Sequence, residues 1–136
     1  MRITARVSYG LRALVVLADA RDEPMKGEAI ARCHHLSVGF LEVVLGELRR
    51  AGLVDSKRGG QGGYWLARPP DTITVADVIR VLDGESPSVP TPQGSDELAP
   101  VWRTLVDGYM DAAEQITVAG LVTDAGGTSD TEALSQ

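Results

Sequence analysis

The 136-residue chain has a formal net charge of −6, with 43% hydrophobic and 4% aromatic residues. This length accommodates one domain with its own hydrophobic core, and the hydrophobic fraction excludes a largely disordered chain. No apolar run approaches the roughly 20 residues that span a bilayer, and the N-terminal residues lack the apolar segment of a secretory signal. Because the only cysteine, Cys33, cannot form an internal disulfide, we expect a soluble cytoplasmic protein with no membrane contact.

The two halves of the chain differ in charge. Residues 1–70 carry 11 lysine and arginine residues against 7 aspartate and glutamate residues, whereas residues 71–136 carry 2 against 12. Because an electrostatic footprint is local, a basic first half is compatible with binding of a polyanion at one end of the molecule. Taken alone, the asymmetry is equally compatible with no functional meaning.

Three helices are predicted in the first half of the chain. The first spans about Thr4 to Ala20, the second spans Gly27 to His34, and Ser37 is a favourable N-cap for a third helix that ends at Gly52. In the third helix, apolar residues at i, i+3, i+4 and i+7 predict a buried face; they are Leu41, Val44, Leu45 and Leu48.

A glycine-rich β-hairpin and a fourth helix follow. Residues 53–67 have the composition of two short strands around the tip sequence 58–63. Thr74 and Asp77 resemble a capping box at the start of the fourth helix, which Gly84 ends. The order of helix, short helix, tight turn, longer helix and hairpin is that of a winged helix-turn-helix domain.

The last third of the chain predicts a linker and a long helix. Residues 84–95 contain three prolines and two glycines, which is typical of a loop, and residues 123–136 are polar and expected to be disordered. Between them, a heptad stripe predicts a helix over 96–122 that pairs with a second copy of the chain rather than only with its own domain. The stripe consists of Leu98, Trp102, Leu105, Tyr109, Ala112, Ile116 and Ala119.

These elements predict a mainly α fold: a winged helix-turn-helix domain over 1–83 with a two-stranded β wing, the linker 84–95, and the dimerisation helix 96–122. Such a domain places the start of its third helix in the major groove of double-stranded DNA. There Glu42 can accept a hydrogen bond from a cytosine amino group, and Val43 can contact a thymine methyl group. We expect base contacts from Gly39, Phe40, Glu42 and Val43, and backbone or minor-groove contacts from Ser37, Arg49, Lys57 and Arg58.

Other functional classes have less support in the sequence. No nucleophile–base set, carboxylate pair or phosphate-binding loop is evident, so we expect no catalytic residue. Cys33, His34 and His35 do not predict a metal site, because consecutive helical residues point in different directions. A dimeric interaction module that has lost DNA binding remains an alternative, although the presence of Glu42, Lys57 and Arg58 counts against it.

The sequence resembles the Rrf2 family of winged helix-turn-helix regulators over about residues 1–122. The resemblance implies a homodimer that pairs through its long C-terminal helices and usually represses transcription at a pseudo-palindromic site. It also implies that Ser37, Phe40 and Glu42 meet the major groove and that Arg58 enters the minor groove. The matching segments are Tyr9–Leu14, Phe40–Glu42 with Leu45 and Leu48, Ala51–Val54, Arg58–Gly59, Gly62–Tyr64 and Ile73–Ile79.

The chain also departs from the pattern of that family. Many members hold an iron–sulfur cluster on three cysteines after the fourth helix, yet residues 84–100 contain none, and Ser8 and Arg12 occupy the positions where some members have an acidic ligand. The resemblance therefore implies a member without this cofactor, and Val43 in place of a frequent glutamine implies a different preferred DNA site. The regulating signal stays open between a small molecule beside the dimerisation helix, a protein partner, oxidation of Cys33 and constitutive binding.

Overall fold

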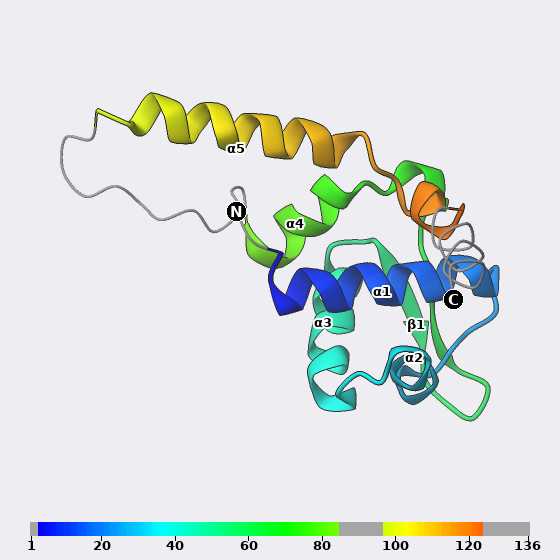
Figure 1. Cartoon of the computed structure of the whole chain (residues 1–136). Helices are drawn as coiled ribbons and strands as arrows, with labels where there is room; N and C mark the ends of the chain where they lie inside the picture. The colour runs from blue at the N-terminus through cyan, green and yellow to red at the C-terminus, as the bar shows by residue number, and fades with distance from the viewer. Residues whose placement is uncertain (1–2, 85–96, 124–136) are drawn as a thin grey trace, which may run out of the picture.

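The computed structural model describes residues 3–84 and 97–123, and the predicted mainly α fold with a two-stranded wing is confirmed (Figure 1). A further helical segment over 118–123 follows the named elements. Residues 85–96 and 124–136, which hold nearly all of the predicted linker and tail, lie outside the described residues. The elements are α1 (Ala5–Ala20), α2 (Gly27–His34), α3 (Val38–Arg50), β1 (Val54–Lys57), β2 (Gly63–Leu66), a 3-10 turn (Pro70–Thr72), α4 (Val75–Asp83) and α5 (Ala99–Glu114).

Side-chain caps define where α3 and α4 begin. Ser37 Oγ accepts a hydrogen bond from the backbone N–H of Phe40 at the start of α3. Thr74 and Asp77 form the predicted capping box at the start of α4, with both hydrogen bonds 3.0 Å long. Each cap satisfies backbone donors that the first turn of a helix leaves without an intrahelical partner, which fixes the helix start at that residue.

The core lies between α1, α3 and α4. The predicted stripe of α3 is fully buried, and it packs with buried residues of the two neighbouring helices, such as Leu14 and Ile79. Arg6 forms an ion pair with Glu47, and Thr4 donates a hydrogen bond to Asp83, so polar contacts at the surface join the same three helices. This packing holds α3 at the surface with its opposite face toward solvent.

The wing is attached to the rest of the domain along its second strand. β1 and β2 pair antiparallel, from Val54 opposite Leu66 to Lys57 opposite Gly63. On its other edge, β2 pairs with the segment after α1: Met25 N donates to Tyr64 O (2.9 Å), and Tyr64 N donates to Met25 O (2.8 Å). A β-carbon at Gly63 would lie 2.7 Å from the Met25 backbone, so this close approach requires glycine.

The prediction of a single helix over 96–122 was wrong at the C-terminal end of that range. α5 ends at Glu114, and the chain then pairs with the segment before α4. Val75 N donates to Ile116 O and Val118 N donates to Ile73 O, each over 2.8 Å. Residues 115–117 are therefore outside any helix, so heptad spacing continues where the helix does not.

Candidate nucleic-acid interface

The first turns of α3 expose a glycine and small apolar side chains to solvent. Gly39 and Val43 are exposed, the latter to 55% of its surface, and Val38 beside them is 40% exposed. No atom lies within 4 Å of the position that a β-carbon would take at Gly39. The absence of a side chain there therefore serves no internal packing and leaves the helix backbone open to a large partner.

Tyr9 of α1 supports the turn that leads into α3. Its hydroxyl accepts a hydrogen bond from the backbone N–H of Ser37 (3.1 Å), and its ring stacks on Phe40 with centroids 4.7 Å apart. Phe40, predicted to face bases, is thus half-buried with its ring engaged inside the protein. No local sequence pattern assigns a role to Tyr9, because this contact joins residues 31 positions apart.

Glu42 also contacts other elements, although it lies on the exposed face of α3. Its Oε2 accepts a hydrogen bond from the Tyr64 hydroxyl of the wing (2.7 Å), and its Oε1 lies against Gly27, where a β-carbon would overlap it. Burial, the hydrogen bond to Glu42 and the negative charge of Glu42 together raise the pKa of Tyr64 to about 12. Tyr64 therefore remains a hydrogen-bond donor at neutral pH, and its contact with Glu42 was not foreseen.

Basic residues surround the wing. Lys57 and Arg58 are exposed where β1 runs into the tip. Arg49 at the end of α3 donates a hydrogen bond to Ser56 Oγ in β1 (3.3 Å), and Lys26 before α2 donates one to Gly59 O at the tip (2.9 Å). The structure thus brings together three predicted residues and adds Lys26, which the sequence analysis did not select.

The residues predicted for dimerisation occupy different surroundings. Leu98 and Leu105 are 52% and 46% exposed, and Ala112 is also exposed. Trp102 and Tyr109 are half-buried, and Tyr109 packs against the hydrophobic core beside the buried Met110. Beyond the end of α5, the exposed Ile116 and the half-buried Ala119 complete the predicted set. Val101, which is 48% exposed, was not predicted and extends the apolar surface of the first half of α5.

A shallow groove of about 310 Å³ runs along α1. Its walls are almost wholly apolar, with Arg12 and the partly buried His34 at its margin. Burial, followed by the charges of Arg12 and His35, lowers the pKa of His34. The lining residues are Ile3, Ser8, Leu11, Arg12, Val15, His34 and Leu121.

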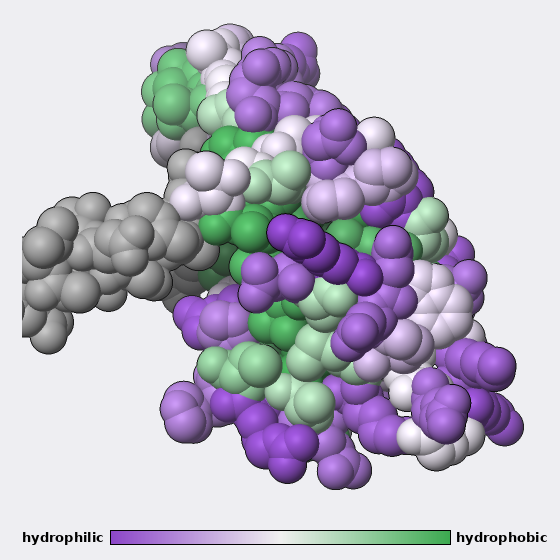
Figure 2. All heavy atoms as spheres, turned by 90° about the vertical axis from the view of Figure 1, so that its right-hand side faces the viewer, coloured by the Kyte–Doolittle hydropathy of each residue, from purple (hydrophilic) through white to green (hydrophobic). Residues whose placement is uncertain are grey.

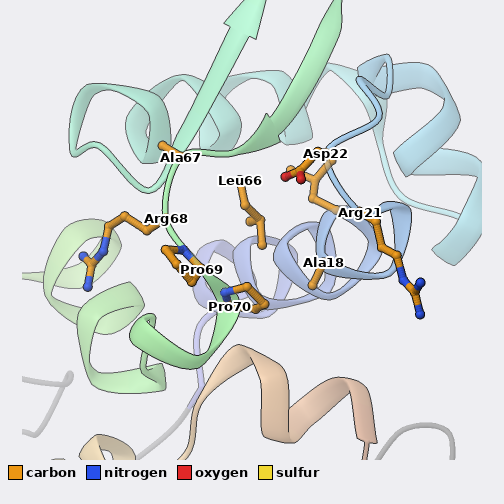
Figure 3. A pocket seen from close by; sticks show the side chains of 9 residues that line it. Ala18, Arg21, Asp22, Leu66, Ala67, Arg68, Pro69 and Pro70 are labelled. Carbon is orange, nitrogen blue, oxygen red and sulfur yellow. The ribbon is translucent and has the colours of Figure 1, made fainter.

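A second cleft, of about 660 Å³, lies between the end of α1 and the chain that leaves the wing (Figure 3). Leu17, Leu66 and Pro70 contribute apolar surface, while the side chains of Arg21 and Arg68 point away from the cleft in opposite directions. The molecular face at this end of α1 is mostly hydrophilic, with a central strip of hydrophobic residues (Figure 2). The cleft therefore lies at the base of the wing rather than beside α5, where the sequence analysis placed a possible effector pocket.

The donor set of the chain does not fit an iron–sulfur cluster. The sequence contains one cysteine, Cys33, which is exposed on α2 and donates a hydrogen bond to Ala29 O (3.4 Å). Among the described residues, no group of three or more histidine, cysteine, aspartate or glutamate side chains is placed to hold a metal ion. Within residues 3–84 and 97–123, no helix is both long and apolar enough to cross a membrane.

An exposed helix start beside a basic, glycine-tipped wing defines the winged helix-turn-helix class of DNA-binding proteins. Residues 3–124 match the Rrf2 family, described as an iron-dependent transcriptional regulator, and the chain belongs to that family. It is 38% identical over 133 residues to the HTH-type transcriptional regulator CymR of Bacillus subtilis, covering 97% of this chain and 94% of that protein.

Two solved structures agree with this assignment. The structure of B. subtilis CymR, the global cysteine regulator, has a TM-score of 0.79 and 35% sequence identity, covering 90% of this chain and 97% of that one. The structure of IscR from T. potens has a TM-score of 0.78 and 34% identity, covering 92% of this chain and 88% of that one. The protein is thus a DNA-binding transcription regulator and not an enzyme.

Proposed function

We propose that the protein is a homodimeric repressor that binds a pseudo-palindromic DNA site without an iron–sulfur cluster. The observation that carries this proposal is the linkage of α3 to the basic wing through Arg49 and Ser56. It joins the C-terminal end of α3 to the strand that leads to Lys57 and Arg58, so a groove-reading surface and a phosphate-binding surface lie side by side in one domain.

The residues of this surface fall into two groups, according to the part of the DNA that each can contact. Gly39 and Val43 offer close approach and apolar contact to base edges. Ser37, Arg49, Lys57 and Arg58 offer hydroxyl and guanidinium or ammonium donors to the phosphate backbone or the minor groove. Phe40 acts chiefly by holding the turn through its stacking on Tyr9.

The shape of α5 supports a homodimer. Its first turns extend beyond α4 and away from the body of the molecule (Figure 1). There Leu98, Val101 and Leu105 expose apolar surface that a partner must cover to remove it from water. A second copy fits this requirement, because it presents the same exposed apolar surface on its own α5 and an almost wholly apolar groove along its α1.

A homodimer explains why the proposed DNA site is pseudo-palindromic, and binding to that site explains repression. A two-fold symmetric dimer presents two copies of α3, so its preferred site repeats one half-site as an inverted repeat. Occupation of such a site within a promoter blocks transcription without any catalytic step.

An effector of this regulator has a candidate site in the cleft at the base of the wing. The cleft is within the usual size range of small-molecule sites. Its lining residue Leu66 is two positions from Tyr64, whose backbone pairs with Met25. A small molecule that fills the cleft would therefore act on the attachment of the wing. A protein effector or oxidation of Cys33 would instead act without occupying this cleft.

The test of the proposed function is DNA binding by the purified protein prepared in air. A fragment from upstream of its own gene and a random-sequence library serve as probes, and binding is followed by fluorescence anisotropy at increasing salt. We expect a discrete site whose affinity falls steeply with salt, since neutralising phosphates releases counterions. In the double variant Lys57→Ala, Arg58→Ala, we expect about a 10- to 100-fold loss.

Arg103→Ala, which removes one exposed positive charge from α5, is the control and retains binding. An absence of sequence-selective binding at low salt by the unaltered protein would contradict the proposal. It would favour the alternative of a dimeric interaction module that has lost DNA binding.

A further inference from the structure

The carboxylate of Glu42 is turned toward the protein rather than away from it. Glu42 projects from the exposed face of α3, but its two oxygens meet the Tyr64 hydroxyl (2.7 Å) and the backbone at Gly27. A side chain that reads a base edge must direct its acceptors outward. In this arrangement, at least one acceptor of Glu42 already has a protein partner.

Three features of the fold favour this inward position. Tyr64 supplies a hydroxyl donor from β2, and its raised pKa of about 12 keeps that proton in place at neutral pH. Gly27 begins α2, whose N-cap residue Lys26 makes no side-chain capping bond, and the partial positive charge of a helix start attracts an anion. Because Gly27 has no side chain, the carboxylate can reach this place.

Resting on the proposed function, we propose that Tyr64 is a specificity-determining residue that acts through Glu42. The Tyr64 hydroxyl holds this carboxylate beside α2, whereas a cytosine amino group in the groove requires it turned outward, so the two positions of Glu42 exclude each other. With the hydroxyl present, Glu42 stays on α2 and contributes little to base discrimination. Where this hydrogen bond is absent, Glu42 turns to the groove and favours cytosine.

The position of the Tyr64 hydroxyl depends on how the wing is attached. Tyr64 is held through its backbone by two hydrogen bonds to Met25, which lies between α1 and α2. A shift of β2 against this segment would move the tyrosine hydroxyl relative to α3. Such a shift would change the DNA sequence that the protein prefers, and not only its affinity.

Two different substitutions release Glu42. Tyr64→Phe removes the hydroxyl and keeps the ring, while Gly27→Ala places a methyl group where Oε1 lies and forces the flexible carboxylate outward. Each protein is used to select sequences from a double-stranded library with a randomised half-site, and the selected sites are then compared by competition anisotropy. We expect both variants to raise the preference for cytosine at one and the same position by about 10-fold.

The background variant Glu42→Ala separates this mechanism from a loosened wing. In that background, neither Tyr64→Phe nor Gly27→Ala has a carboxylate to release, so the base preference does not change. A purely structural loss in the wing would lower the affinity for all sequences by a similar factor. Glu28→Gln, which neutralises an exposed carboxylate in the first turn of α2, is the charge control and keeps the original preference.

Two results would overturn the inference. One is a base preference that stays within twofold of the unaltered protein in both Tyr64→Phe and Gly27→Ala. The other is a changed preference that persists when Glu42 is alanine. Failure of the unaltered protein to select any sequence overturns the proposed function itself, and is thereby distinguished from failure of this inference alone.

Discussion

Gly10 of α1 lies directly against Leu82 of α4. A β-carbon at Gly10 would stand 2.6 Å from Leu82 Cδ1 and 3.4 Å from Val78 Cγ1. The two helices therefore approach each other at a position where α1 has no side chain, and this contact holds α4 on the core beneath α5.

Gly10→Ala is expected to lower the free energy of unfolding by about 1–3 kcal/mol, since the added methyl group overpacks a buried contact. The matched control is Gly46→Ala in α3, where a β-carbon would meet Arg50 at an ordinary 3.6 Å. There the change should raise stability by about 0.5–1 kcal/mol through helix propensity. Urea denaturation measures both, and equal effects at the two sites would contradict the packing argument.

Gly39→Ala should separate stability from DNA binding. Nothing lies near the new methyl group, so the free energy of unfolding should rise by about 0.5 kcal/mol. If the start of α3 enters the major groove, the same methyl group will lower DNA affinity by about 10-fold or more, because the bare backbone no longer fits as closely. Thermal denaturation and anisotropy give the two values. Unchanged DNA affinity would argue against groove insertion at this turn.

Leu105→Glu is expected to convert the proposed homodimer to a monomer. Leu105 is 46% exposed on the part of α5 that would meet a second copy, and a buried charge at a helix pair without a counter-ion costs several kcal/mol. Thr104→Glu adds the same charge to the exposed neighbouring position and should leave the dimer intact. Analytical ultracentrifugation distinguishes the two species. A Leu105→Glu protein that sediments as a dimer would exclude this surface of α5 from the interface.

The tyrosine titration should report the contact with Glu42. Because the folded pKa of Tyr64 is raised from 10.0 to about 12, its contribution to stability is complete below pH 10 and is lost as the pH rises toward 12. Glu42→Gln removes the negative charge, so Tyr64 should ionise at lower pH than in the unaltered protein. Ultraviolet absorbance of tyrosinate follows this ionisation. A titration curve that is the same in both proteins would show that Glu42 does not influence Tyr64.

Local sequence patterns were sufficient for most of the fold. The buried stripe of α3, the caps at Ser37 and Thr74, and the glycine-rich wing each depend on residues within a few positions of one another. Such interactions depend on helix and strand periodicity and on unpaired backbone donors, which a single sequence displays directly. The basic residues of the wing could be selected from the same patterns, although their role in DNA binding remains a prediction.

Tertiary structure determined the contacts between residues that are far apart in the sequence. The heptad stripe ran past Glu114 in sequence, but α5 ends there and the next residues form hydrogen bonds with Ile73 and Val75 instead. Likewise, the contact between Glu42 and Tyr64 joins α3 to the wing across 22 positions, and Gly27 from a third element makes room for it. The sequence by itself determined the elements and the chemistry of the surface, because both follow from near neighbours. Which side chains are free to act on a partner follows from how those elements pack, and no local pattern encodes that.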